Sequence, residues 1–269
     1  MMRAPRLALA RTPGALLRAA LVLAVTLAPL AAAASPGDAA RDATLVAALS
    51  AALLVLFEYG STTPALVDFR DAKPVNRLRF AMAAGTLLLT LAYVEAAPGG
   101  ALDQAGRALG AALGGWASPV GMIADALSRP SALGPDAATR GAAAVALAGA
   151  AALSAAASAA IWFGSWPGAA GAFNRFTNLP TFDAAEAADA PQRLRRLGLQ
   201  AIVMGFALPV ALLAPIAAAM ILLVDAEVMS QPLPLAWTLT IWAAASGAQA
   251  IRGVALLKLS RVLAEEDAA

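Results

Sequence analysis

Long apolar stretches alternate with polar ones along this chain of 269 residues. After an apolar N-terminal segment, apolar runs recur at roughly 43–59, 80–97, 141–163, 198–224 and 234–257. Crossing a hydrocarbon core of about 30 Å takes about 20 predominantly apolar residues in a helix. Such a segment must be helical, because its backbone polar groups need partners within the segment. The pattern therefore predicts an all-α, polytopic membrane bundle with these five runs as its spans.

The N-terminal segment, residues 1–34, has two interpretations. A basic stretch precedes an apolar run of small residues, and Ser35-Pro36-Gly37 then breaks the run. This order is typical of a secretory signal peptide, here with cleavage near Ala34. If the segment is kept instead, it is the first of six transmembrane helices. In both cases we expect residues 35–269 to form a single helical membrane domain.

The basic residues indicate how the spans are oriented. Fifteen of the nineteen Lys and Arg residues fall in four bands, and the other four lie in the polar segments between these bands. If the apolar runs cross the membrane, the four bands lie on one side of it and the other four residues on the opposite side. Positively charged loops stay in the cytoplasm during insertion. We therefore expect a bacterial inner-membrane protein with cytoplasmic loops at 61–79 and 164–197, a cytoplasmic C-terminus, and an outer loop at 100–140. Nucleic acid is not expected as a partner, because the cations mark loop sides and not one continuous face.

The outer loop is longer than a simple connection. Leu102, Leu109 and Leu113 recur at helical spacing, and a second amphipathic stretch runs from 120 to 127. Trp116 lies between the two stretches, where an interfacial anchor would be expected. The pattern predicts two short helices in the outer membrane interface. The alternative is an ordinary polar connector.

Composition narrows the possible chemistry. Hydrophobic residues make up 61% of the chain and charged residues 13%, and there is no Cys and no His. The chain therefore has no disulfide, no thiolate nucleophile and no imidazole base. The usual zinc, copper and haem ligands are also missing. We expect no metal, no cofactor and no catalytic residue.

The two inner loops hold the candidate binding residues. Charged residues concentrate in the first loop, and the second adds polar residues beside an aromatic cluster. These residues are candidate contacts for a membrane protein or an anionic lipid headgroup: Glu58, Asp68, Arg70, Asp71, Arg77, Arg79, Asn174, Asn178 and Asp183. The six in or beside the first loop are expected to form a local polar network, with Pro74 starting the next helix. The alternative is that the cations only retain the loop in the cytoplasm.

Three functions are compatible with this pattern. The leading hypothesis is a non-enzymatic accessory, scaffold or assembly factor whose inner loops contact a partner. An alternative is a small transporter or channel, with Pro209, Pro215, Gln249 and Arg252 along its path. A second alternative is a lipid-modifying intramembrane enzyme that uses carboxylates, such as Glu58 with Asp68 or Asp71.

Overall fold

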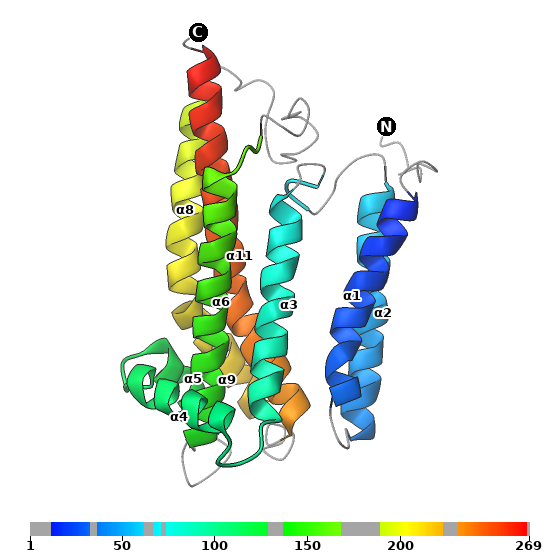
Figure 1. Ribbon diagram of the computed structural model, residues 1–269, viewed down its shortest axis with the longest axis vertical. Coiled ribbons are helices and arrows are strands. Elements are labelled where there is room, and N and C mark those ends of the chain that lie inside the picture. Colours follow the sequence, from blue (N-terminus) through cyan, green and yellow to red (C-terminus); the bar gives the residue numbers. More distant parts are fainter. Residues whose placement is uncertain are drawn as a thin grey trace. The chain divides into compact units, whose positions relative to one another are not determined.

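The computed structural model describes residues 12–32, 37–61, 67–70, 74–128, 137–167, 189–222 and 231–267. Within these ranges the chain is helical and contains no β-strand (Figure 1). Among the described residues, five segments are long and apolar enough to cross a membrane: Thr12–Ala31, Ala40–Gly60, Val75–Val94, Ala137–Phe163 and Ala190–Met220. The predicted all-α membrane protein with several spans is therefore confirmed.

Four of these segments overlap the predicted runs 43–59, 80–97, 141–163 and 198–224, and the fifth differs from the prediction. This remaining segment, Thr12–Ala31, belongs to the N-terminal helix α1 (Thr12–Ala32). The predicted run 234–257 lies within α11 (Pro232–Asp267), which is not one of the five. Gln249 and Arg252 lie within that run and reduce its apolar character. At 36 residues α11 is about 54 Å long, which exceeds the thickness of a hydrocarbon core.

The chain divides into two compact units, residues 1–76 with 165–189, and residues 77–164 with 190–269. In the first unit, α1 and α2 (Asp38–Gly60) pack side by side (Figure 1). Ala15 and Ala48 are fully buried, so small side chains allow this close approach. Large apolar side chains of α2 are exposed, namely Val46, Leu49, Leu53, Leu54 and Phe57. Such a surface suits lipid.

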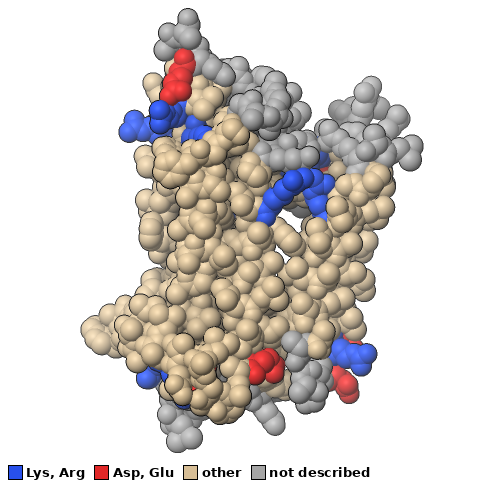
Figure 2. All heavy atoms as spheres, viewed as in Figure 1, with Lys and Arg blue, Asp and Glu red and all other residues tan. Residues whose placement is uncertain are grey.

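The second unit is built on α3 (Val75–Val94), α6 (Ala137–Phe163), α8 (Ala190–Ala211) and α11 (Figure 1). Glycines bring α8 and α11 close together. A Cβ added at Gly253 would lie 2.6 Å from Cγ1 of Ile202, and one at Gly198 would lie 3.0 Å from the carbonyl oxygen of Gly253. Close helix packing through small residues is typical of membrane bundles. In both units, Figure 2 shows charged side chains towards the helix ends and uncharged flanks between them.

The predicted run 198–224 is divided into two helices, α8 and α9 (Leu213–Leu222), which are interrupted at Leu212. Proline removes a backbone donor from a helix, so Pro209 and Pro215 both weaken this region. The indole Nε1 of the buried Trp242 donates a hydrogen bond of 2.8 Å to the carbonyl oxygen of Pro209. This bond ties the interrupted region to α11.

The segment predicted to be the outer loop contains two short helices, α4 (Ala101–Leu113) and α5 (Pro119–Ser128), and their helical form agrees with the prediction. Gly106 of α4 lies against the ring of Tyr93, and a Cβ at Gly110 would lie 2.8 Å from the backbone nitrogen of Gly141. The glycine face of α4 is therefore docked on α3 and α6. Trp116, between the two helices, is 90% exposed. The placement of this segment in the membrane interface remains a prediction.

Candidate functional site

The structure describes five of the nine candidate contact residues. They are Glu58, Asp68, Arg70, Arg77 and Arg79. The other four, Asp71, Asn174, Asn178 and Asp183, lie outside the described residues. Glu58, Asp68 and Arg70 belong to the first unit and Arg77 and Arg79 to the second, so the two groups are described separately.

Arg70 is buried at the C-terminal end of α2. Its side-chain nitrogen Nη1 donates to the carbonyl oxygen of Glu58 at 2.9 Å, to that of Ser61 at 3.1 Å, and to Oγ of Ser61 at 3.2 Å. The last carbonyls of a helix have no partner within the helix, and a cation is favourable there. Arg70 therefore caps α2 from the following loop.

Glu58 also holds this loop, but here the side chain belongs to the helix and the backbone group belongs to the loop. Its carboxylate Oε1 accepts a hydrogen bond of 3.1 Å from the backbone N–H of Val67, and the side chain is buried. Ser61 adds a bond of 3.1 Å from its Oγ to the carbonyl oxygen of Glu58. We call Glu58, Ser61, Val67 and Arg70 the α2-end cluster. The helix end accepts bonds from Val67 and from Arg70, which lie at the two ends of the segment 67–70, so this segment is held against the helix.

Phe69 lies within this held segment. It is fully buried and has a φ of 59°, a backbone conformation that is uncommon for a bulky residue and costs about 1–3 kcal/mol. Its ring packs edge-on against Trp166, with ring centroids 6.0 Å apart. Beside it, the carbonyl oxygen of Asp68 accepts a bond of 2.7 Å from Nδ2 of Asn76. The buried aromatic contact helps to keep Phe69 in this conformation.

The basic residues of α3 have different surroundings. The helix begins at Val75, directly after Pro74, as the sequence predicts. Arg77 is exposed, and among the described residues it makes no hydrogen bond or ion pair. Arg79 is half-buried. The candidate residues are therefore not equivalent, because the chain itself engages Arg70 whereas Arg77 is open to a partner.

Two other polar side chains support helix ends in the second unit. Nζ of Lys258 donates to the carbonyl oxygens of Ile161 and Gly164, at 2.7 and 2.5 Å, and so caps the end of α6. At the start of α4, Asp103 accepts the backbone N–H of Gly99 at 2.8 Å and Nε of Arg107 at 2.7 Å. The Gly99 bond, and then Arg107, lower the pKa of Asp103.

Sequence reasoning missed Ser61, Phe69 and Trp166. The carbonyl and hydroxyl of Ser61 receive Arg70, and the two aromatic rings pack together although they are far apart in the chain. The predicted aromatic cluster at the start of the second inner loop was the only signal, and it did not indicate Phe69 as the contact.

Within the described ranges, no group of three or more acidic side chains is placed to hold a metal ion. No family model matches the chain, and neither a curated protein nor a solved structure is significantly similar to it. Its function has to be inferred from its own residues.

Proposed function

We propose that this membrane protein is a non-enzymatic accessory or assembly factor whose first inner loop binds another membrane protein. The observation that carries the proposal is the order built into residues 67–70. Retention of a loop in the cytoplasm needs only positive charge. The α2-end cluster and the buried Phe69 instead fix the backbone, which is what a binding surface of defined shape requires.

Arg77 is the side chain most suited to contact the partner. It is exposed and follows the held segment on the next helix. Arginine is enriched among residues that dominate binding energy, because its planar guanidinium makes several directed hydrogen bonds. The contact we propose is therefore with a carboxylate on the partner.

The two alternatives are less well supported. The carboxylate of Glu58 already accepts the N–H of Val67, which does not favour its use as a catalytic base. The bond from Trp242 to Pro209 holds in place a residue that the transporter hypothesis puts along its path. Neither observation adds support for transport or lipid chemistry.

The proposal includes an orientation in a bacterial inner membrane. Loops 61–79 and 164–197 and the C-terminus are cytoplasmic, and α4 and α5 lie outside. The packing of α1 along α2 supports the six-span alternative, in which residues 1–34 are kept and α11 is the last span. N-terminal sequencing of the purified protein would show Met1 if the segment is kept, and a start near Ser35 if it is cleaved.

The test is purification of the tagged full-length protein from its native membrane in a mild detergent. Arg77→Gln is compared with Arg41→Gln, which removes an exposed cation in the first turn of α2. We expect Arg77→Gln to reduce recovery of a co-purifying membrane protein by about fivefold or more, as loss of roughly 1 kcal/mol of binding predicts. Arg41→Gln should recover it normally, and both variants should reach the wild-type membrane level.

Two results would contradict the proposal. If both variants recover the same proteins as wild type, the first loop serves only in retention. If Arg77→Gln instead loses a bound anionic phospholipid while all proteins are recovered, the loop is a headgroup site and the accessory function is wrong.

A further inference from the structure

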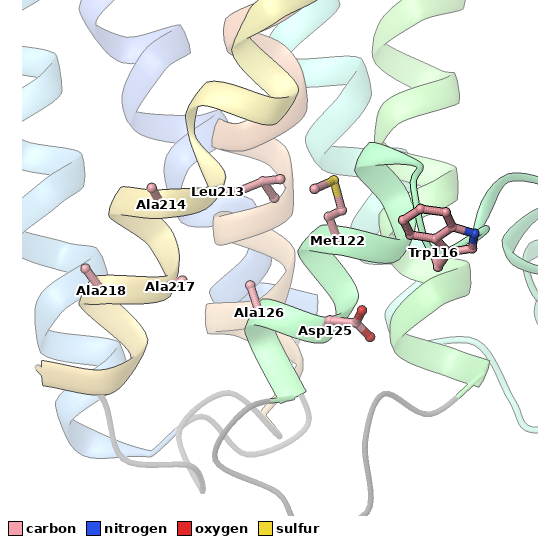
Figure 3. A pocket seen from close by; sticks show the side chains of 8 residues that line it. All are labelled: Trp116, Met122, Asp125, Ala126, Leu213, Ala214, Ala217 and Ala218. Atoms are coloured by element: carbon pink, nitrogen blue, oxygen red, sulfur yellow. The ribbon is translucent and has the colours of Figure 1, made fainter.

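In the second unit, a groove lies between α5 and α9 (Figure 3). Its volume is about 620 Å³, which falls within the roughly 300–1,000 Å³ typical of sites for small molecules. Trp116 and Asp125 line one side of the groove together with the apolar Met122 and Ala126, and Leu213, Ala214, Ala217 and Ala218 line the other. The small side chains of α9 leave this space open.

The two sides of the groove differ in chemistry. Asp125 is exposed and, among the residues that the structure describes, makes no hydrogen bond or ion pair. Trp116 is 90% exposed beside it. The facing surface consists of alanine methyls and Leu213, and these belong to the end of the apolar segment Ala190–Met220. A ligand that fills the groove must therefore have a polar part and an apolar part.

The polar side selects a cation. A carboxylate attracts a positive group, and an indole face adds a cation–π attraction of about 0.5–1 kcal/mol at an exposed site. Tryptophan is also enriched at the level of lipid headgroups. The apolar side selects hydrocarbon, since contact with it removes methyl groups from water. A cationic amphiphile matches both sides.

We propose that this groove binds a phospholipid with a primary-amine headgroup. The ammonium lies at Asp125 and Trp116, and the upper part of one acyl chain covers Ala214 and Ala217. A phospholipid without an amine would bring only its negative phosphate to Asp125, so the site discriminates against it. This site is independent of the proposed partner surface on the first inner loop.

The test measures quenching of Trp116 fluorescence by brominated lipid. The full-length protein is reconstituted in phosphatidylglycerol vesicles that contain a small, equal fraction of brominated phosphatidylethanolamine or brominated phosphatidylglycerol. Bromine is placed near the headgroup end of the acyl chain. Subtracting the signal of Trp116→Phe isolates Trp116 from the other four tryptophans of the chain. We expect the ethanolamine lipid to quench about two- to fivefold more effectively, as an exposed ion pair predicts.

Two acid variants separate a site from general interfacial contact. Asp125→Asn keeps the shape of the side chain and removes its charge, so the preference for the ethanolamine lipid should disappear. Glu95→Gln removes another exposed acid of the same unit and should leave the preference unchanged. Equal quenching by the two lipids in the wild type would overturn the proposal, and so would an unchanged preference in Asp125→Asn.

A second copy of the chain is the other occupant to consider. If the groove were an interface between copies, quenching by either lipid would fall as the protein-to-lipid ratio rises. That result would also overturn the proposal. Quenching that stays constant over a tenfold range of this ratio supports a lipid site.

Discussion

At the end of α2, an acid and an arginine are buried, and the chain itself uses both of them. In the groove between α5 and α9, an acid is exposed and has no partner among the described residues. Glu58 and Arg70 hold a loop by bonds to backbone groups, whereas Asp125 makes no such bond among the described residues. The charged residues of the two regions therefore differ in whether the described backbone engages them. An exposed acid that the described backbone does not engage is the one on which we base the proposed ligand site.

The largest effect is expected at Arg70. Arg70→Ala removes the charged donor of the buried carbonyl oxygens of Glu58 and Ser61, and hydrogen bonds to a charged group contribute about 1.5–3 kcal/mol. The thermal unfolding midpoint in detergent should fall clearly. Arg70→Lys should restore part of the loss, because an ammonium can reach some of the same oxygens. An unchanged midpoint in Arg70→Ala would mean that Arg70 does not cap α2.

The next effect concerns how α4 is docked on Tyr93 of α3. A Cβ at Gly106 would meet the ring of Tyr93, with Cζ of that ring only 2.7 Å away. Gly106→Ala should destabilise the protein by about 1–3 kcal/mol, which is typical of overpacking. Gly115→Ala is the matched control, since nothing lies within 4 Å of its added Cβ. Equal unfolding midpoints for the two variants would disprove the close contact of α4 with Tyr93.

Asp103 gives a smaller effect that depends on pH. Its pKa is lowered in the folded state, so its contribution to stability is complete above the ordinary aspartate pKa of about 3.9 and is lost as pH falls through the lower folded value. The wild type should lose its advantage over Asp103→Asn as the pH is taken from 6 to 3. Midpoints measured across this range check the prediction. A difference that does not change with pH would show that the carboxylate is not engaged by Gly99 and Arg107.

The smallest effect is expected at Asp125. Because it is exposed and makes no bond among the described residues, Asp125→Asn should change the free energy of unfolding by less than about 0.5 kcal/mol. Unfolding in detergent without added lipid gives this value. A large loss of stability would place Asp125 with Glu58 and Arg70 as a structural residue and would remove the contrast between the two regions.

The helices could be predicted from the sequence because they follow from apolar length alone. The predicted and the observed bounds of these helices differ. The predicted run 80–97 corresponds to Val75–Val94, since Pro74 starts the helix and the Gly99 turn follows it. The run 234–257 is only part of α11, because the helix continues beyond the run at its C-terminal end through polar residues to Asp267.

The contacts between helices could not be predicted in the same way. In a chain rich in alanine, periodicity does not show which small residue faces which helix. Ser154 lies near Gly247, and Gly198 lies close to Gly253, but neither contact gave a distinct signal in the sequence. The roles of Glu58 and Arg70 depend on backbone groups of Val67 and Ser61, and a sequence pattern does not display those.

The proposed partner surface requires the first loop to be cytoplasmic and α4 and α5 to lie outside. The chain contains no cysteine, so single cysteines can be introduced at Arg77 and at the exposed Ala117 between α4 and α5. Intact spheroplasts are then treated with a membrane-impermeant maleimide. We predict that Ala117→Cys reacts in intact spheroplasts and that Arg77→Cys reacts only after lysis. Labelling of Arg77→Cys in intact spheroplasts would place the first loop outside and contradict the proposed cytoplasmic binding surface.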